Sequence, residues 1–104
     1  MCTTWLFLVS DAIKEGNPSD DELDGLSRRI AEDWKRLGRK LHFTEAELTK
    51  FHKENEDYFE KSYQMLLHWK QRDGKAATYK VLFNALCHPL VQRKDLAQEY
   101  CLMA

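Results

Sequence analysis

The 104-residue sequence has few of the residues that interrupt or cross-link a chain. Its 4 glycines and 2 prolines are too few for a collagen-like or linker-like protein. The three cysteines, Cys2, Cys87 and Cys101, are odd in number and have no paired spacing. We therefore expect reduced thiols and a cytoplasmic protein, and not a secreted domain held together by disulfides. What the composition favours is a globular, helical domain.

Long apolar runs and an excess of one charge are also missing. The run from Trp5 to Val9 is far shorter than the roughly 20 residues of a membrane-spanning helix, and it lacks the flanks of a signal peptide. The 16 basic and 17 acidic residues leave a net charge of -1. This balance argues against a domain-wide basic field for nucleic acid, although charge can still be segregated locally. We predict no membrane insertion.

From Asp21 onward, apolar residues recur every three or four positions, as on one face of a helix. The stripes predict six helices with short connections and no internal repeat. The fold class is therefore all-α, an antiparallel six-helix bundle. In the helix that Thr78 caps, Val81 is expected to face inward beside Leu82. The predicted core consists of Leu26, Ile30, Trp34, Leu37, Leu41, Leu48, Phe51, Leu66, Trp69, Leu82 and Leu86.

Helix boundaries are marked by local signals. Residues 16–21, Gly-Asn-Pro-Ser-Asp-Asp, oppose helix and separate an extension over residues 1–18 from a domain over residues 19–104. The extension is either a short extra N-terminal helix or partly disordered, and the sequence leaves this open. Thr44 and Glu47 have capping-box spacing, which predicts the start of a helix. Gly74 is placed to end another.

Residues suited to catalysis or metal binding are present but poorly arranged. The four histidines are His42, His52, His68 and His88, and no pair of them has the His-x-x-x-His or His-Glu-x-x-His spacing. The cysteines form no Cys-x-x-Cys motif, and the adjacent Cys87 and His88 would point in different directions on a helix. We therefore predict no enzymatic activity, no metal, no cofactor and no small-molecule substrate.

Charge is segregated along the middle of the chain. Basic residues lie opposite the apolar face that contains Trp34, and acidic residues follow within twenty positions. The predicted partner-binding residues are Lys35, Arg36, Arg39, Lys40, Glu45, Glu47, Glu54 and Asp57. A nucleic-acid interface is an alternative use of the basic residues, extended by Arg28 and Arg29. We do not expect it, because the acidic run would repel a polyanion and no aromatic residue is interleaved. Ordinary solvated faces are the third interpretation.

Three segments resemble the death domains, most closely those of the ankyrin type, over about residues 20–103. They are residues 33–41 (Asp-Trp-Lys-Arg-Leu-Gly-Arg-Lys-Leu), residues 43–48 (Phe-Thr-Glu-Ala-Glu-Leu) and residues 65–78, in which Leu66, Trp69 and the run Arg72 to Thr78 follow the family pattern. The resemblance implies a six-helix bundle that pairs with other death domains in signalling complexes for apoptosis or related outcomes.

The resemblance further implies that the domain is a module of a larger protein. Within the family, the second and third helices provide one recurrent contact surface, and the first and fourth provide its complement. Two other functions stay open at this point. One is a structural module that packs against adjoining domains of an ankyrin-repeat parent protein, and the other is a helical nucleic-acid binder.

Overall fold

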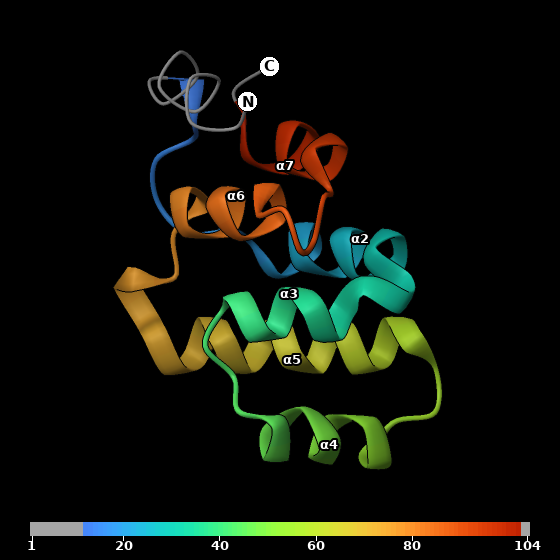
Figure 1. Ribbon diagram of the computed structural model, residues 1–104. Helices are drawn as coiled ribbons and strands as arrows, with labels where there is room; N and C mark the ends of the chain where they lie inside the picture. The colour runs from blue at the N-terminus through green and yellow to red at the C-terminus, as the bar shows by residue number, and fades with distance from the viewer. Residues whose placement is uncertain (1–11, 103–104) are drawn as a thin grey trace.

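The computed structural model describes residues 12–102, and six α-helices lie within that range (Figure 1). They are α2 (Asp20–Ile30), α3 (Trp34–Lys40), α4 (Glu45–Glu54), α5 (Tyr58–Asp73), α6 (Tyr79–Cys87) and α7 (Lys94–Cys101). Two 3-10 turns, Ala31–Asp33 and Gly74–Ala76, follow α2 and α5. The predicted all-α bundle is confirmed. Most of the predicted N-terminal extension, residues 1–11 of 1–18, lies outside the described residues, so the extra helix stays a prediction.

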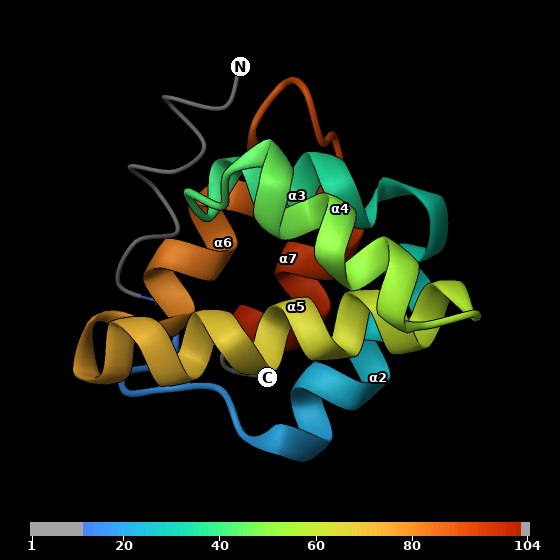
Figure 2. The same ribbon diagram turned by 90° about the horizontal axis from the view of Figure 1, so that it is seen from below.

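The longest helix, α5, packs against α2, α3 and α4. In Figure 2, α2 and the α3–α4 pair lie on opposite sides of it. Met65, Leu66 and Trp69 share one face because they are spaced one, three and four positions apart, and none of them is exposed to solvent. At Gly74 the chain takes a φ of 55° and the helix ends. The α6–α7 pair covers the remaining part of the core.

All eleven core residues named from the sequence are buried, with no more than 5% of the surface of any one exposed. The inward placement of Val81 is wrong, since this residue is 37% exposed. The buried face of α6 is formed by Leu82, Phe83 and Leu86. At 100° per residue, Val81 lies about 140° around the helix from Leu86, and it therefore faces solvent.

Arg72, near the end of α5, fixes the connection between α3 and α4. Its guanidinium donates to the carbonyl oxygens of Leu41 (2.5 Å) and His42 (3.3 Å) and lies 4.6 Å from the ring centroid of Phe43. These bonds satisfy carbonyls at a helix end that would otherwise lack partners. His42 has a φ of 70°, so the chain turns sharply there before Thr44 caps α4. The predicted capping box of Thr44 and Glu47 is present.

The residues just before α2 contact both ends of the bundle. Ile13 is 7% exposed and forms an isolated antiparallel bridge with Leu102. Asn17 donates from Nδ2 to the carbonyl oxygens of Gly74 (3.1 Å) and Ala77 (2.6 Å). Residues 13–17 thus lie against the helices, while the division of the chain at residue 19 stays a prediction.

Glu22 on α2 links this N-terminal segment to α6. Its carboxylate accepts hydrogen bonds from the Tyr79 hydroxyl (2.5 Å), the Ser19 amide (3.0 Å) and the Lys14 ammonium (3.0 Å). Partial burial by itself would raise the pKa of Glu22, but the bonds from Tyr79, Ser19 and Lys14 outweigh it and lower that pKa to about 2. Burial and the bond to Glu22 raise the pKa of Tyr79 to about 12.

We expect Glu22→Gln to lower the free energy of unfolding at neutral pH by about 1–3 kcal/mol, because the ionised carboxylate is the better acceptor. The stabilisation from a carboxyl whose pKa falls on folding is complete above its unfolded pKa of about 4.5 and is lost as the pH falls toward about 2. Urea denaturation should therefore show a smaller difference in the free energy of unfolding between variant and wild type at about pH 3 than at neutral pH. Glu15→Gln, at an exposed position, is the control. Equal stability of Glu22→Gln and wild type at neutral pH would contradict this assignment.

Candidate protein-interaction surfaces

The first candidate surface is the outward side of α3, and we call it the basic surface. The inward side of this short helix holds Trp34, Leu37 and Gly38, all buried. Its four basic side chains therefore project away from the core, with Arg36 and Arg39 exposed and the two lysines half-buried. The basic surface consists of Lys35, Arg36, Arg39 and Lys40.

Three of these four cations already have partners within the domain. Arg39 donates from Nε to Glu45 Oε1 at 2.5 Å, and Arg36 lies 3.7 Å from the Asp33 carboxylate. The Lys35 ammonium is 5.8 Å from the centroid of the Trp34 ring system. The hydrogen bond between Arg39 and Glu45 raises the pKa of Arg39 and lowers the pKa of Glu45. The predicted basic and acidic residues therefore meet at this ion pair.

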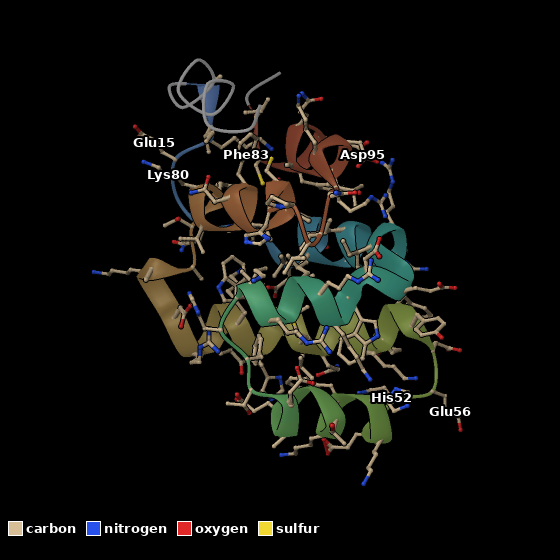
Figure 3. All side chains as sticks on the ribbon, viewed as in Figure 1. Glu15, His52, Glu56, Lys80, Phe83 and Asp95 are labelled. Atoms are coloured by element: carbon tan, nitrogen blue, oxygen red, sulfur yellow. The ribbon has the colours of Figure 1, made fainter. Side chains whose placement is uncertain are left out.

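The four predicted acidic residues do not form one surface with a single role. Glu45 pairs with Arg39, and Glu47 accepts from the Thr44 amide at 2.9 Å as part of the capping box. Glu54 and Asp57 are exposed on either side of the connection between α4 and α5. Figure 3 shows His52 and Glu56 in the same region. The electrostatic effect of Lys61, together with some desolvation, lowers the pKa of His52 there.

A second group of carboxylates was not predicted, and we call it the acidic surface. It combines three residues of α2 with one from α5, and their charges act on the half-buried side chain of Tyr63. Burial and the negative charges nearby raise the pKa of Tyr63. Two of the carboxylates have basic neighbours, Lys70 at 3.0 Å from Asp20 and Arg28 at 3.5 Å from Asp24. The acidic surface consists of Asp20, Asp21, Asp24 and Glu60.

Comparison with known families identifies the bundle. A family model described as the death domain matches residues 20–100. This chain belongs to the death domain family. The human receptor-interacting serine/threonine-protein kinase 1 is 37% identical over 71 residues, which cover 65% of this chain and 11% of the kinase. The chain thus spans about a tenth of the length of this curated relative.

Death domains are protein-interaction modules of signalling proteins, and they have no enzymatic activity of their own. Membership of this family implies interaction with other death-fold domains. The kinase activity and the partners of the relative are not assigned to this chain, because the match covers only 11% of the kinase. The ankyrin-type subfamily stays a prediction.

The candidate metal ligands and one of the thiols can be located among residues 12–102. No group of three or more His, Cys, Asp or Glu side chains there is placed to hold a metal ion. Burial raises the pKa of the Cys101 thiol to about 12, so this thiol stays protonated and is a poor nucleophile. No helix in the same residues is long and apolar enough to cross a membrane.

The different roles of Glu45 and Glu47 can be separated by matched substitutions. We expect Glu47→Ala to lower the melting temperature of the death domain, because it removes half of a capping box. Glu45→Ala should leave the melting temperature almost unchanged, because an exposed ion pair adds little to stability. Circular dichroism melts of the two variants and the wild type measure this. Equal losses of stability in both variants would show that the Arg39–Glu45 pair is structural.

Proposed function

We propose that this death domain assembles with other death domains by contact between the basic surface of one molecule and the acidic surface of the next. It would do so as a module of a larger signalling protein in apoptosis or a related pathway. The observation that supports the proposal most is that the two surfaces lie on different helices, with α3 and α2 on opposite sides of α5 (Figure 2). One molecule could then bind a neighbour on each side.

The position of the acidic surface agrees with the family pattern. In the order of the bundle, α2 and α5 are the first and fourth helices, and α3 is the second. The resemblance to death domains assigns complementary contacts to these helices. The complement of the basic surface is therefore Asp20, Asp21, Asp24 and Glu60, and the predicted Glu45 is left as a neighbour of Arg39 within the same molecule.

Charges of this kind favour selective and fast encounter more than tight binding. Exposed ion pairs contribute little each, and salt screens them. Complementary surfaces nevertheless guide association and exclude partners with like charge. A contact that is weak by itself becomes effective when several domains are held together in one assembly. Reversible assembly at high local concentration is the mode of action that this arrangement favours.

Nucleic acid is a weaker alternative for the basic surface. The net charge of -1 gives the domain no overall basic field for a polyanion, and the basic surface has only four cations to neutralise phosphates. The other alternative, a structural module, would need a surface that packs against an adjoining domain of the parent protein. The charged surfaces are less suited to such permanent packing than to a reversible contact.

The proposal is tested by charge reversal on a panel of purified death domains that includes this chain. We expect at least one member to bind, and Arg36→Glu/Arg39→Glu to weaken that binding about tenfold or more, because two attractive contacts become repulsive. Biolayer interferometry at low and high salt measures the affinity. Lys75→Glu/Lys80→Glu is the matched control, since it makes the same charge change at exposed positions away from α3; Lys80 is labelled in Figure 3. Undiminished binding by the Arg36→Glu/Arg39→Glu variant, with its fold intact, would refute the proposed function.

A further inference from the structure

Tyr58, the first residue of α5, is the most exposed aromatic side chain among residues 12–102, at 51%. The chain has 4 tyrosines, and the other three are half-buried and pack against the core. The Tyr79 hydroxyl is bonded to Glu22, and Tyr100 lies against Gly25 of α2. An enzyme that modifies tyrosine hydroxyls on the folded domain therefore reaches Tyr58 most easily.

The backbone before Tyr58 is already extended. Residues 55–57 connect α4 to α5 at the edge of the bundle and are not helical (Figure 1). Asn55 has φ −132° and ψ 144°, and Asp57 has φ −88° and ψ 145°. A catalytic cleft that binds its substrate as an extended chain could therefore take up this connection with little change in its conformation.

The first turn of α5 is also easier to open than a capped turn. Within the described residues, the Asp57 side chain makes no capping hydrogen bond to the amides of α5. A helix start without such a bond is less stable, and it opens locally at lower cost. Tyr58 is exposed and the next two residues are half-buried, whereas full burial begins at Lys61. Local opening can thus present Tyr58 without disturbing the core.

The segment around Tyr58 is strongly acidic. Residues 54–60, Glu-Asn-Glu-Asp-Tyr-Phe-Glu, carry four negative charges and no positive one. Three of the four residues before Tyr58 are exposed carboxylates, and no other tyrosine of the chain has more than one carboxylate among the four residues before it. A cleft lined with Lys and Arg would attract this segment and discriminate against the others.

A cation stands ready for a negative charge on the Tyr58 side chain. The Lys61 ammonium lies 5.2 Å from the centroid of the Tyr58 ring. Only 7% of Lys61 is exposed, so its aliphatic stem is held against the domain. Helix side chains lean toward the N-terminus, where the helix dipole favours negative charge. The folded domain would therefore tolerate a phosphate on Tyr58.

We propose that Tyr58 is a phosphorylation site for a protein tyrosine kinase with a basic substrate cleft. Tyr58 Oη attacks the γ-phosphorus of ATP, and the new bond joins Oη to that phosphorus. The bond from this phosphorus to the bridging oxygen breaks and releases ADP, while the phenolic proton passes to a base of the kinase. The product carries about −1.5 to −2 additional charge at neutral pH. The site uses no residue of the basic surface, so it can fail without the proposed function.

The first measurement is phosphorylation of the folded 104-residue chain by purified catalytic domains of tyrosine kinases with a basic substrate cleft, with ATP and Mg²⁺. Mass spectrometry gives the initial rate at each tyrosine, and autophosphorylation shows that each kinase is active. We expect Tyr58 to react about tenfold faster than Tyr63, Tyr79 or Tyr100, because those three need a larger opening of the fold. No phosphate on Tyr58, or an equal rate at another tyrosine, would overturn the proposal.

The second measurement tests recognition of the acidic segment. Glu56→Lys reverses one charge beside Tyr58, and Glu15→Lys is the matched control at another exposed position, far from Glu56 (Figure 3). We expect Glu56→Lys to lower kcat/KM at Tyr58 about tenfold, because an attractive contact with the kinase becomes repulsive. Glu15→Lys should leave kcat/KM at Tyr58 almost unchanged. Equal values for the two variants would contradict a basic substrate cleft.

The third measurement tests the role of Lys61 in the purified phosphorylated chain. A ³¹P NMR titration follows the second ionisation of the phosphate, which ordinarily occurs at about pH 6. We expect its midpoint at lower pH in the wild type than in Lys61→Gln, because a nearby ammonium favours the dianion. Lys75→Gln, at an exposed position beyond the other end of α5, is the control. Equal midpoints in the wild type and Lys61→Gln would show that Lys61 is not the counter-ion of the phosphate.

Discussion

Burial of one face of α5 is the interaction on which the rest of this death domain depends. Met65, Leu66 and Trp69 are removed from water by contact with α2, α3 and α4, and burying side chains of this size contributes about 1.5–3 kcal/mol each. Because α2, α3 and α4 all turn their apolar sides to α5, their charged sides must face outward. The basic and acidic surfaces on opposite sides of α5 are thus a consequence of core packing (Figure 2).

The charged side chains are arranged on this frame by local and long-range hydrogen bonds. Arg72 satisfies the carbonyls at the end of α3, and Glu22 joins the N-terminal segment to α6. The bonds from Arg72 to Leu41 and from Tyr79 to Glu22 are partly buried, so they are screened less than the exposed Arg39–Glu45 pair. Charge therefore has two separate roles in this domain. Partly buried ionic groups help to hold the helices, and exposed ones are available to a partner.

Much of the fold could be predicted from the sequence because its signals are local. The spacing of Leu26, Ile30 and Trp34 indicates a buried helix face, and Thr44 with Glu47 indicates where a helix begins. Val81 was placed wrongly because two adjacent apolar residues, Val81 and Leu82, do not define the centre of a helix face. The centre of the buried face of α6 is defined by all of its buried residues together, and these are known only from the folded structure.

The candidate site was harder to predict because its members are distant in sequence. Glu60 is separated from Asp20 by 40 positions, and the charges of both act on Tyr63 only because α2 packs on α5. A groove lined by Arg36, Arg39 and Lys40 and by residues 89–92 likewise joins α3 to a turn about fifty positions later. The spacing of Glu47 from Thr44 predicts a helix cap, yet the charge of the same residue also predicts a partner contact. A short stripe of charge cannot distinguish a cap or an internal ion pair from a free surface.

Zero-length carbodiimide cross-linking of a mixture of ¹⁴N- and ¹⁵N-labelled chain tests the central claim most directly, since it joins lysines only to carboxylates in contact with them. The account predicts cross-linked peptides of mixed isotope that connect Lys35 or Lys40 to Asp20, Asp21, Asp24 or Glu60. Cross-links only between peptides of one isotope, or mixed cross-links that do not include the α3 lysines, would contradict it.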